Sequence, residues 1–495
     1  MLAIEYGTGR ERGGHVRPPH ESDRGRGQDA AGESAAHQRG QQRDRGARRA
    51  RDRPVRDARP LRLREHRRGE GRGDRRAGLR RARRARHRPD RDAERDPDRD
   101  LHPHDRQEGQ IAASLLRGAA LADGRSPSLR TGISLLIRGD RVAYLGPDGG
   151  APHGTDIDAV DASGATIVPG LVDCHAHFTG LGGADWIARF QDDEAALLSR
   201  APDAARALVR AGVLAARDVG APHHLNLRIR DEMRGQSDAP LIVAAGTWIA
   251  RRDTYVPFAI QVDSAEQLKA AALAELDAGA DWVKLAVDTG GMKSPSATFS
   301  ADELRPMVEA VHARGAKVAA HSQFAGADNA ARAGIDSVEH GFGVDDRAAR
   351  LMANGTALVT TLSVPASVRT FASTVGGKWS EQEPARREMQ ERAFAAVRAA
   401  KKAGVRIVAG SDFGGGSVRP GHLAWEVELL VAAGLEPYEA LAAATWRGGE
   451  LLGNGAGTIT QGGAANVVLV HGDPLADPAA LWRVWRVYRQ GVRVA

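Results

Sequence analysis

Short apolar runs alternate with helical patterns through the middle of the chain. Eight runs have the length and the Val, Leu, Ile and Ala content of buried strands, and longer segments between them are typical of helices. This alternation predicts β/α units around a parallel sheet. The predicted strands are residues 170–178, 214–219, 241–245, 282–287, 317–321, 337–340, 357–362 and 406–413.

The segments between these strands carry helix start and stop signals. Ser264 with Gln267 and Ser300 with Glu303 have the spacing of a capping box, and the glycines that end helical patterns are Gly279, Gly315 and Gly404. Eight repeats over about 280 residues match the size of a (β/α)8 TIM barrel. A doubly wound open sheet is the alternative fold, but no glycine-rich dinucleotide fingerprint follows a strand.

Both ends of the patterned region look β-like. Residues 133–137 and 141–145 form a predicted hairpin, and residues 466–470 and 484–494 are short Val-rich runs near the C-terminus. Two strands are not stable alone, so we expect the two ends to meet in one small β-sandwich. The predicted domains are an N-terminal sandwich part at 109–169, the barrel at 170–455 and a C-terminal sandwich part at 456–495.

The first 108 residues have a different composition. They contain 31 Arg, no Lys and 20 acidic residues, but only nine Ile, Leu, Met or Val and no Phe or Trp. A segment with so few large apolar residues cannot form a packed core. We therefore predict a disordered or spuriously translated Arg-rich tail at 1–108. Its scattered acidic residues disfavour nucleic-acid binding, which a basic run would otherwise suggest.

The sequence shows neither a membrane-spanning segment nor a secretory signal. The longest charge-free apolar run, residues 239–250, is shorter than the ~20 residues that a membrane span requires. Cys174 is the single cysteine, so an intramolecular disulfide is excluded. The N-terminus has no apolar segment before a cleavage signal, so we expect a cytoplasmic protein without membrane contact, unless an incorrect start has removed a signal peptide. Assembly as a homo-oligomer is compatible with the sequence.

Polar residues interrupt the predicted strands at or near their carboxyl ends, which is the catalytic face of a barrel. Side chains alternate along a strand, so His175 and His177 point to the same side and can share one metal ion, while Cys174 points toward the helices. A single buried histidine is usually a hydrogen-bonded core residue, and a single lysine often reaches solvent. Together, however, five strands place a chemically coherent set at one end: His175, His177, Lys284, His321, His340 and Asp412.

These motifs resemble the amidohydrolase superfamily of metal-dependent hydrolases. Residues 167–177 (Ile-Val-Pro-Gly-Leu-Val-Asp-Cys-His-Ala-His) are similar to its first-strand signature, and residues 338–341 and 410–412 to those of strands six and eight. Residues 463–469 resemble the return strand into the β-sandwich, with Asn466 where the family usually has Asp. The resemblance extends from about residue 110 to the C-terminus and implies the barrel fold.

Lys284 indicates the subclass. Deaminase-like members and imidazolonepropionases, which are related in outline, use one metal and lack a lysine ligand on strand four, whereas the binuclear prolidase-like group has one. The resemblance implies that Lys284 is carboxylated by carbon dioxide and bridges two divalent ions. His175, His177 and Asp412 would complete the first site, and His321 and His340 the second. The expected metal is Zn²⁺, with Mn²⁺, Co²⁺ or Fe²⁺ as alternatives.

The resemblance implies an amidohydrolase that cleaves amide bonds with a metal-activated hydroxide. Asp412 would accept the proton of the attacking hydroxide and deliver it to the leaving amine. The expected substrates are Xaa-Pro-like dipeptides or N-acyl amino acids. Cyclic amides, as cleaved by imidazolonepropionases, and organophosphates or esters are the alternatives. A non-catalytic or nucleic-acid-associated protein is disfavoured, because all six ligands are present.

Two segments depart from the family pattern. Gln323 stands where relatives often place His or Tyr, and it can donate a hydrogen bond but cannot act as an acid. The segment 246–255 lacks the Gly-Gly-His of many relatives. Arg251 and Arg252 follow the third strand, where a guanidinium could clamp a substrate carboxylate, although a solvated pair is at least as good an interpretation. The predicted substrate-binding residues are Arg251, Arg252, Tyr255 and Gln323.

Overall fold

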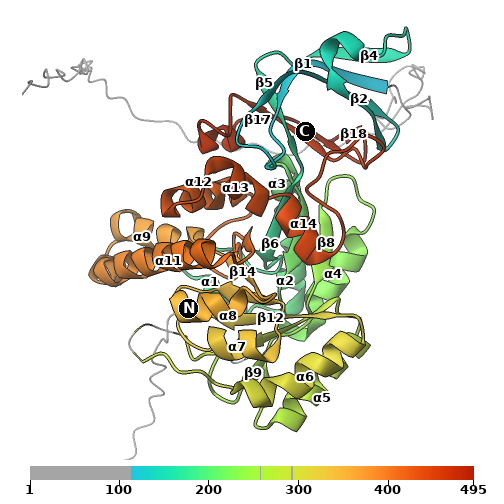
Figure 1. The fold of residues 1–495 in the computed structure, drawn as a ribbon. Helices are drawn as coiled ribbons and strands as arrows, with labels where there is room; N and C mark the ends of the chain where they lie inside the picture. Colours follow the sequence, from blue (N-terminus) through green and yellow to red (C-terminus); the bar gives the residue numbers. More distant parts are fainter. Residues whose placement is uncertain (1–112, 257, 291, 293) are drawn as a thin grey trace, which may run out of the picture. The chain divides into compact units, whose positions relative to one another are not determined.

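The computed structural model describes residues 113–256, 258–290, 292 and 294–495. The predicted tail at 1–108 lies outside the described residues. The described part has a mixed α/β fold in which a region of parallel strands and surrounding helices is inserted between two groups of strands from the chain ends (Figure 1).

Ten parallel strands form the central region in two sheets. The first has the order β6-β7-β8, and the second has the order β10-β9-β11-β12-β13-β14-β15. A parallel bridge joins Ala176 at the end of β6 to Phe413 after β15, so the two sheets meet at that edge. The bounds are β6 Leu171–Ala176, β7 Val213–Asp218, β8 Leu241–Ala244, β9 Ile249–Arg251, β10 Ile260–Val262, β11 Trp282–Ala286, β12 Lys317–Ser322, β13 Ser337–His340, β14 Ala357–Thr360 and β15 Ile407–Ala409.

All eight predicted strands are confirmed as β6, β7, β8 and β11 to β15. Two three-residue strands, β9 and β10, were not predicted, because they are too short to show a periodic pattern. The last predicted strand is shorter than expected: β15 ends at Ala409, and Asp412 then adopts a left-handed backbone conformation with φ of 52°. The arrangement is TIM-barrel-like, and closure of a complete eight-stranded barrel stays a prediction.

Helices follow most of these strands and present polar residues outward. The predicted starts are confirmed, since the Ser264 side chain accepts from Gln267 N, and Ser300 and Glu303 form a capping box. The main helices are α3 Ala201–Arg210, α4 Leu225–Met233, α5 Ala265–Asp277, α6 Ala301–Ala313, α7 Ala327–Ala333, α8 Asp346–Met352, α9 Ser363–Thr374, α11 Glu383–Ala403, α12 Leu423–Ala433, α13 Pro437–Ala443 and α14 Trp446–Leu452.

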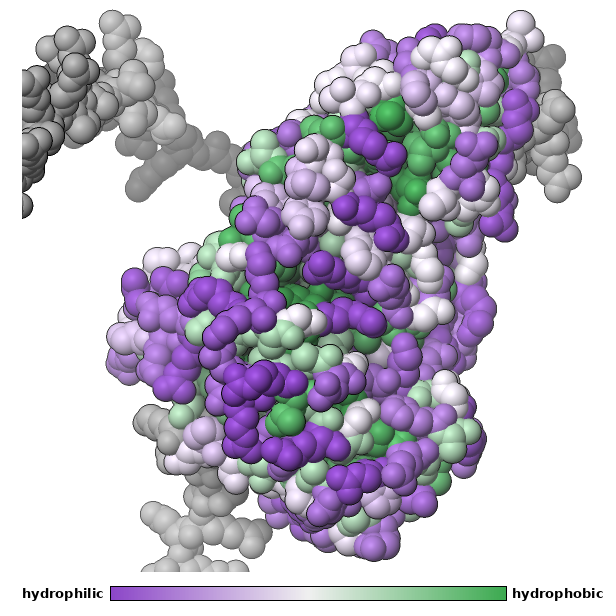
Figure 2. Space-filling model, viewed as in Figure 1, coloured by the Kyte–Doolittle hydropathy of each residue, from purple (hydrophilic) through white to green (hydrophobic). Residues whose placement is uncertain are grey.

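Shorter helices complete the loops around the strands. These are α1 Trp186–Arg189, α2 Glu194–Ser199 and α10 Lys378–Glu381, with 3-10 turns at Asp148–Gly150, Pro222–His224 and Pro478–Trp482. Figure 2 shows mostly hydrophilic residues on the viewed face, with hydrophobic residues visible between them. None of the helices among the described residues is long and apolar enough to cross a membrane.

The two ends of the described chain meet in one eight-stranded sheet, as predicted. Its order is β18-β17-β16-β5-β1-β2-β3, with β4 paired to β1, and β16 from the C-terminal part runs antiparallel to β5. The structure therefore shows one sheet from both ends, while the β-sandwich description and the exact domain limits stay predictions. The bounds are β1 Ala113–Leu121, β2 Arg130–Arg138, β3 Arg141–Pro147, β4 Ile157–Asp161, β5 Ala165–Pro169, β16 Val467–His471, β17 Val484–Arg489 and β18 Val492–Arg493.

Candidate metal centre

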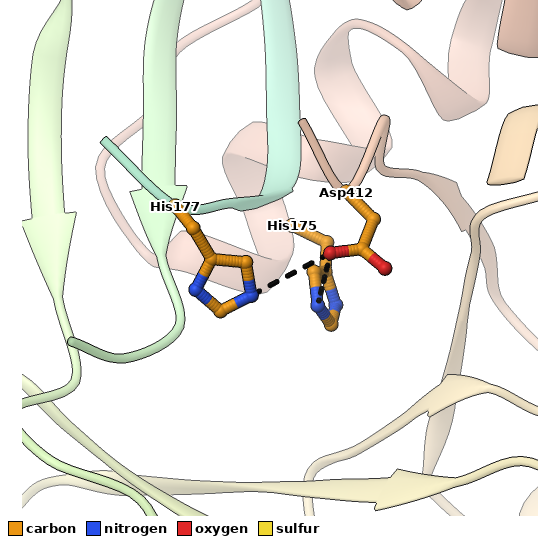
Figure 3. A group of neighbouring side chains, drawn as sticks. All are labelled: His175, His177 and Asp412. Carbon is orange, nitrogen blue, oxygen red and sulfur yellow. Dashed lines mark ion pairs between the residues drawn. The ribbon is translucent and has the colours of Figure 1, made fainter. Parts of the chain in front are cut away.

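His175 in β6, His177 just after this strand and Asp412 after β15 converge at one point. Asp412 Oδ1 lies 3.5 Å from His175 Nε2 and 3.5 Å from His177 Nε2, and the three side chains point toward one another (Figure 3). These separations are too long for hydrogen bonds. They match the ~3.3 Å between neighbouring ligand atoms of a tetrahedral ion bound at about 2.0–2.1 Å. The three residues can therefore hold a divalent metal ion.

A second pair of histidines lies on neighbouring strands. The register of β12 and β13 places Ser322 opposite His340, and the His340 Nε2 and His321 Nδ1 atoms are 2.8 Å apart. The Tyr255 hydroxyl is 3.4 Å from the same His321 atom. Burial lowers the pKa of both imidazoles well below the ordinary value, so both rings are neutral at pH 7 and have lone pairs available for a metal.

Lys284 comes from β11, adjacent to β12, and its side chain is buried. Among the described residues, its ammonium nitrogen has no hydrogen-bond partner. Burial lowers the pKa of Lys284 to about 8, because removal from water disfavours the charged form. A substantial fraction of the side chain is therefore a neutral amine near physiological pH.

Three histidines use one ring nitrogen for orientation and direct the other into the site. The Nδ1 atoms of His175, His177 and His340 contact Glu339 Oε2 at 2.7 Å, the Gly220 carbonyl at 2.7 Å and the Thr361 hydroxyl at 2.8 Å. A carbonyl and a carboxylate accept hydrogen bonds, so Nδ1 of His177 and of His175 carries the hydrogen. In both rings Nε2 then carries the free lone pair, as it does in metal-binding histidines whose other nitrogen is held by a hydrogen bond.

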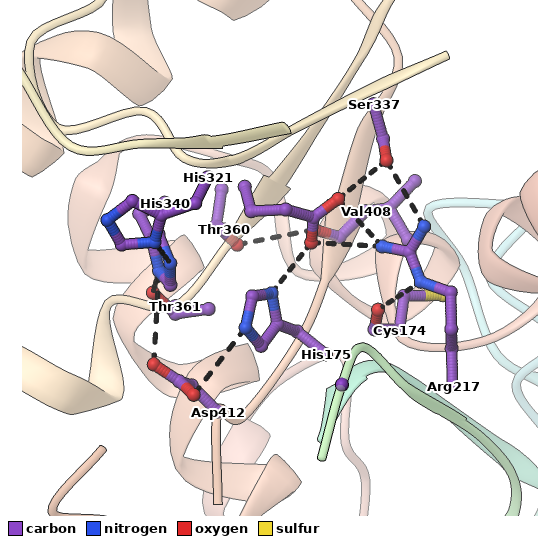
Figure 4. Close-up of polar contacts among 12 residues, drawn as sticks. Cys174, His175, Arg217, His321, Ser337, His340, Thr360, Thr361, Val408 and Asp412 are labelled. Carbon is purple, nitrogen blue, oxygen red and sulfur yellow. Dashed lines mark hydrogen bonds and ion pairs between the residues drawn. The ribbon is translucent and has the colours of Figure 1, made fainter. Parts of the chain in front are cut away.

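The carboxylate that orients His175 belongs to a buried charged network (Figure 4). Arg217 Nη2 donates to both oxygens of Glu339 at 2.8 and 2.9 Å, and Arg217 Nε donates to the Cys174 carbonyl at 2.7 Å. Both charged side chains are fully buried. Ser337 contacts both of them, and the guanidinium also stacks over the Trp282 ring at 4.4 Å.

Arg217→Met is expected to lower the free energy of unfolding by about 3–5 kcal/mol, because it leaves Glu339 buried without its counter-charge. Chemical denaturation measures this change. The matched control is Arg228→Met, which removes an exposed pair with Glu232 on α4 and should change stability little. Adding Glu339→Gln to Arg217→Met should recover part of the loss. Equal stability of the Arg217 and Arg228 variants would contradict this account of the network.

Asp173 and Ser411 connect the strands that carry the first three ligands. Asp173 Oδ1 accepts hydrogen bonds from the backbone of His175 at 3.2 Å and of Ser411 at 2.9 Å. Asp412 follows Ser411, and burial raises the pKa of the Asp412 carboxyl to about 8. The positive φ of Asp412 costs about 1–3 kcal/mol, and such strain is typical of functional sites. Gly415 closes the turn, and a side chain there would place Cβ 2.0 Å from the His177 ring.

The six predicted ligands line one cavity. Most of the wall is apolar. Aromatic residues lie near the His177 ring, with Phe190 and Trp248 ring centroids at 6.0 and 5.2 Å. The apolar and aromatic lining residues are Trp186, Phe190, Trp248, Tyr255, Phe342, Val364, Pro365, Val368, Trp379 and Met389.

Two of the four predicted substrate-binding residues line this cavity. Tyr255 and Gln323 do so, and Gln323 Oε1 is buried without a partner among the described residues. Arg251 donates to the Thr298 and Asp263 carbonyls and pairs with Glu303, while Arg252 pairs with Asp263 at 2.7 Å on the surface. Neither arginine lines the cavity, so a carboxylate clamp at Arg251 or Arg252 stays a prediction that their contacts do not favour.

Sequence reasoning did not assign roles to Arg217, Glu339 and Arg386. Charged residues inside the predicted buried strands β7 and β13 were the available signal for Arg217 and Glu339, since such residues are rarely buried without a partner. Arg386 lines the cavity but lies on α11, in a part of the sequence rich in surface charges, so its sequence context gave no signal.

A TIM-barrel-like fold with buried histidine, lysine and aspartate side chains at the carboxyl ends of its strands is an architecture typical of metal-dependent hydrolases. The sequence model of the amidohydrolase family matches residues 166–494. The chain therefore belongs to the amidohydrolase family, as its motifs predicted.

Three similar proteins illustrate the range of this family. An uncharacterized protein of Mycobacterium tuberculosis is 32% identical over 323 residues, covering 64% of this chain and 82% of that protein. Ochratoxinase of Aspergillus niger is 30% identical over 241 residues, covering 45% of this chain and 49% of ochratoxinase. The crystal structure of a Xaa-Pro dipeptidase with methionine bound in its active site superposes with a TM-score of 0.69 and 26% identity, covering 77% of this chain and 99% of that one.

Proposed function

We propose that the protein is a binuclear metal-dependent amidohydrolase, built on a (β/α)8 barrel, that cleaves dipeptides or N-acyl amino acids. One observation carries this proposal. Six side chains with nitrogen or oxygen ligand atoms line one buried cavity. In three of the histidines a hydrogen bond at Nδ1 fixes the ring so that Nε2 faces the cavity. Outer partners of this kind fix the tautomer and the direction of metal-binding imidazoles.

The residues fit two divalent ions. His175, His177 and Asp412 would hold the first, since Asp412 Oδ1 has no hydrogen-bond partner among the described residues and lies equally far from both histidines. His321 and His340 would hold the second, because both imidazoles are buried, neutral and adjacent, and His321 Nε2 has no hydrogen-bond partner among the described residues. Imidazole and carboxylate ligands suit Zn²⁺ well.

Lys284 would bridge the two positions after reaction with carbon dioxide. The neutral amine attacks the carbon of CO₂, a nitrogen–carbon bond forms, and the nitrogen loses a proton to give an anionic carbamate. Burial of an unpartnered Lys284 nitrogen beside the ligands supports this modification, because it leaves the amine partly neutral. The carbamate also supplies negative charge to a cavity that would otherwise bring two dications together with one carboxylate.

When bound, two divalent ions supply an activated water and polarise the scissile carbonyl. Beside two cations Asp412 would be ionised despite its burial, because opposite charges favour the carboxylate. It would then accept the proton of the attacking water and pass it to the nitrogen of the leaving amine, since an amide nitrogen leaves poorly without a proton. The Tyr255 hydroxyl donates a hydrogen bond to the carbonyl oxygen as negative charge develops there. Burial raises the pKa of Tyr255 well above its ordinary value, so the hydroxyl keeps its proton.

The test is a hydrolysis screen with the zinc-loaded protein prepared in bicarbonate buffer. The panel contains dipeptides, including Xaa-Pro, N-acetyl amino acids, a cyclic imide and a carboxylic ester. We expect turnover of the first two groups, detected as release of free amino acid, and its loss on chelation. Turnover of only the cyclic imide or the ester would contradict the substrate proposal and leave the broader assignment to the amidohydrolase family.

A further inference from the structure

Arg386 is a buried cation in the wall of the metal-site cavity. It lies near the start of α11 and is 7% exposed. Its polar contacts are weak: Nη2 is 3.4 Å from Gln382 Oε1, Nη1 is 4.0 Å from the Met389 sulfur, and Nε has no hydrogen-bond partner. Among the described residues, no carboxylate forms an ion pair with Arg386.

Such a placement is energetically costly. A guanidinium removed from water needs a counter-charge, and burial lowers the pKa of Arg386 with no opposing contribution from an acid. Arg217 is the instructive comparison, since it is fully buried and makes two hydrogen bonds to Glu339. Glu339 of the chain itself neutralises Arg217, whereas Arg386 faces the cavity without a carboxylate partner among the described residues. An anionic group of a bound molecule would satisfy Arg386.

The guanidinium is the fitting partner for a carboxylate. Its N–H groups form a planar fork that binds both oxygens of a carboxylate at once. Val368, Trp379 and Met389 line the same cavity as Arg386, and the Met389 sulfur is in contact with its guanidinium. Val368 and Trp379 belong to one apolar cluster with Phe371 on α9. A large apolar group next to the carboxylate would fit these walls.

We propose that Arg386 anchors the α-carboxylate of the substrate, and that the leaving amine is an α-amino acid with a large apolar side chain. This inference rests on the proposed function and specifies its substrate class. The carboxylate anchor is then Arg386, which lines the cavity, rather than Arg251 or Arg252, which are already paired with carboxylates. Arg386 is a binding residue, with no part in the proton transfers assigned to Asp412.

Matched substrates that differ only in the carboxylate test the anchor. The pairs are Ala-Phe with Ala-Phe amide, and N-acetyl-phenylalanine with its primary amide. Wild-type enzyme should prefer the free acids. Arg386→Met should lower kcat/KM for the free acids about 10-fold to 100-fold, the effect expected of a lost charged hydrogen bond, and leave the amides nearly unchanged. The control is Arg392→Met on the same helix, because Arg392 is exposed and pairs with Glu388.

Binding of the product gives a readout that does not need turnover. Calorimetric titration of the zinc-loaded protein with L-phenylalanine and with L-phenylalaninamide should show that only the free acid loses affinity in Arg386→Met. If Arg386→Met does not fold, Arg386→Lys keeps the charge but not the fork and should still reduce the preference for the acid. Equal affinity of wild type and variant for L-phenylalanine, or no preference of the wild type for free acids, would overturn the anchor.

These experiments distinguish a failure of the Arg386 anchor from a failure of the proposed function. If the panel is hydrolysed but Arg386 variants treat acids and amides as wild type does, the anchor is wrong and the proposed function stands. If no amide is hydrolysed while L-phenylalanine binding depends on Arg386, the proposed function is wrong and the carboxylate site stands.

Discussion

Lys284→Ala is expected to lower kcat for amide hydrolysis by about 10³-fold or more and to lower the metal content from about two ions per chain to about one or fewer. The proposed bridging anion is lost with the side chain, and the electrostatic stabilisation that a second ion supplies is worth several kcal/mol. Elemental analysis gives the metal content, and turnover is measured on the dipeptide that the screen identifies. A short carboxylate such as propionate should restore part of the activity by occupying the position of the carbamate.

The matched control for this variant is Lys317→Met. Lys317 begins β12, the neighbouring strand, and its Nζ donates to the Leu451 carbonyl away from the cavity. The Lys317→Met protein should keep the full metal content and turnover. A Lys284→Ala protein with wild-type activity and one ion would place the chain with the single-metal members of the family.

Asp412→Asn is expected to lower kcat by about 10²-fold to 10⁴-fold, the usual contribution of a general acid and base. The amide has almost the same size but cannot carry the proton from the attacking water to the leaving amine. A second substrate separates proton transfer from metal binding. The amine of a p-nitroanilide needs little protonation to leave, so Asp412→Asn should reduce its hydrolysis less than that of a dipeptide. Kinetics on both substrates measure the difference.

The control for the aspartate variant is Asp203→Asn, because this carboxylate lies on the exposed face of α3 and pairs with Arg206. It should leave kcat unchanged. An equal loss on both substrates in Asp412→Asn, together with lost zinc, would contradict the proton-transfer role and leave Asp412 as a metal ligand.

The convergence of the six candidate ligands on one cavity could be predicted because their positions follow from strand geometry. His175 and His177 share a side of one strand, and the carboxyl ends of parallel strands meet at one edge, so residues from β6, β12, β13 and β15 come together without any knowledge of the helices. The sheet from both chain ends could also be predicted, since isolated apolar strands need partners. The strands β9 and β10 could not, because three residues show no period.

The substrate side of the cavity was harder to predict for a physical reason. Helix α11 is long and carries many surface charges, so nothing in its local pattern separates the buried Arg386 from the exposed Arg387. Its place depends on how α9 and α10 pack beside it. Arg251 shows the converse, because it follows the predicted strand but turns toward Glu303 and the Asp263 carbonyl. Loop and helix packing, rather than strand order, decides which arginine lines the cavity.

Titration of metal-free protein with Zn²⁺ in bicarbonate buffer tests the binuclear proposal most directly. Activity on the best dipeptide or N-acyl amino acid is recorded as a function of zinc equivalents per chain. The proposal predicts that activity rises until about two equivalents are bound and then stays constant. A plateau at one equivalent, with no further gain at two, would contradict a two-metal centre bridged by Lys284.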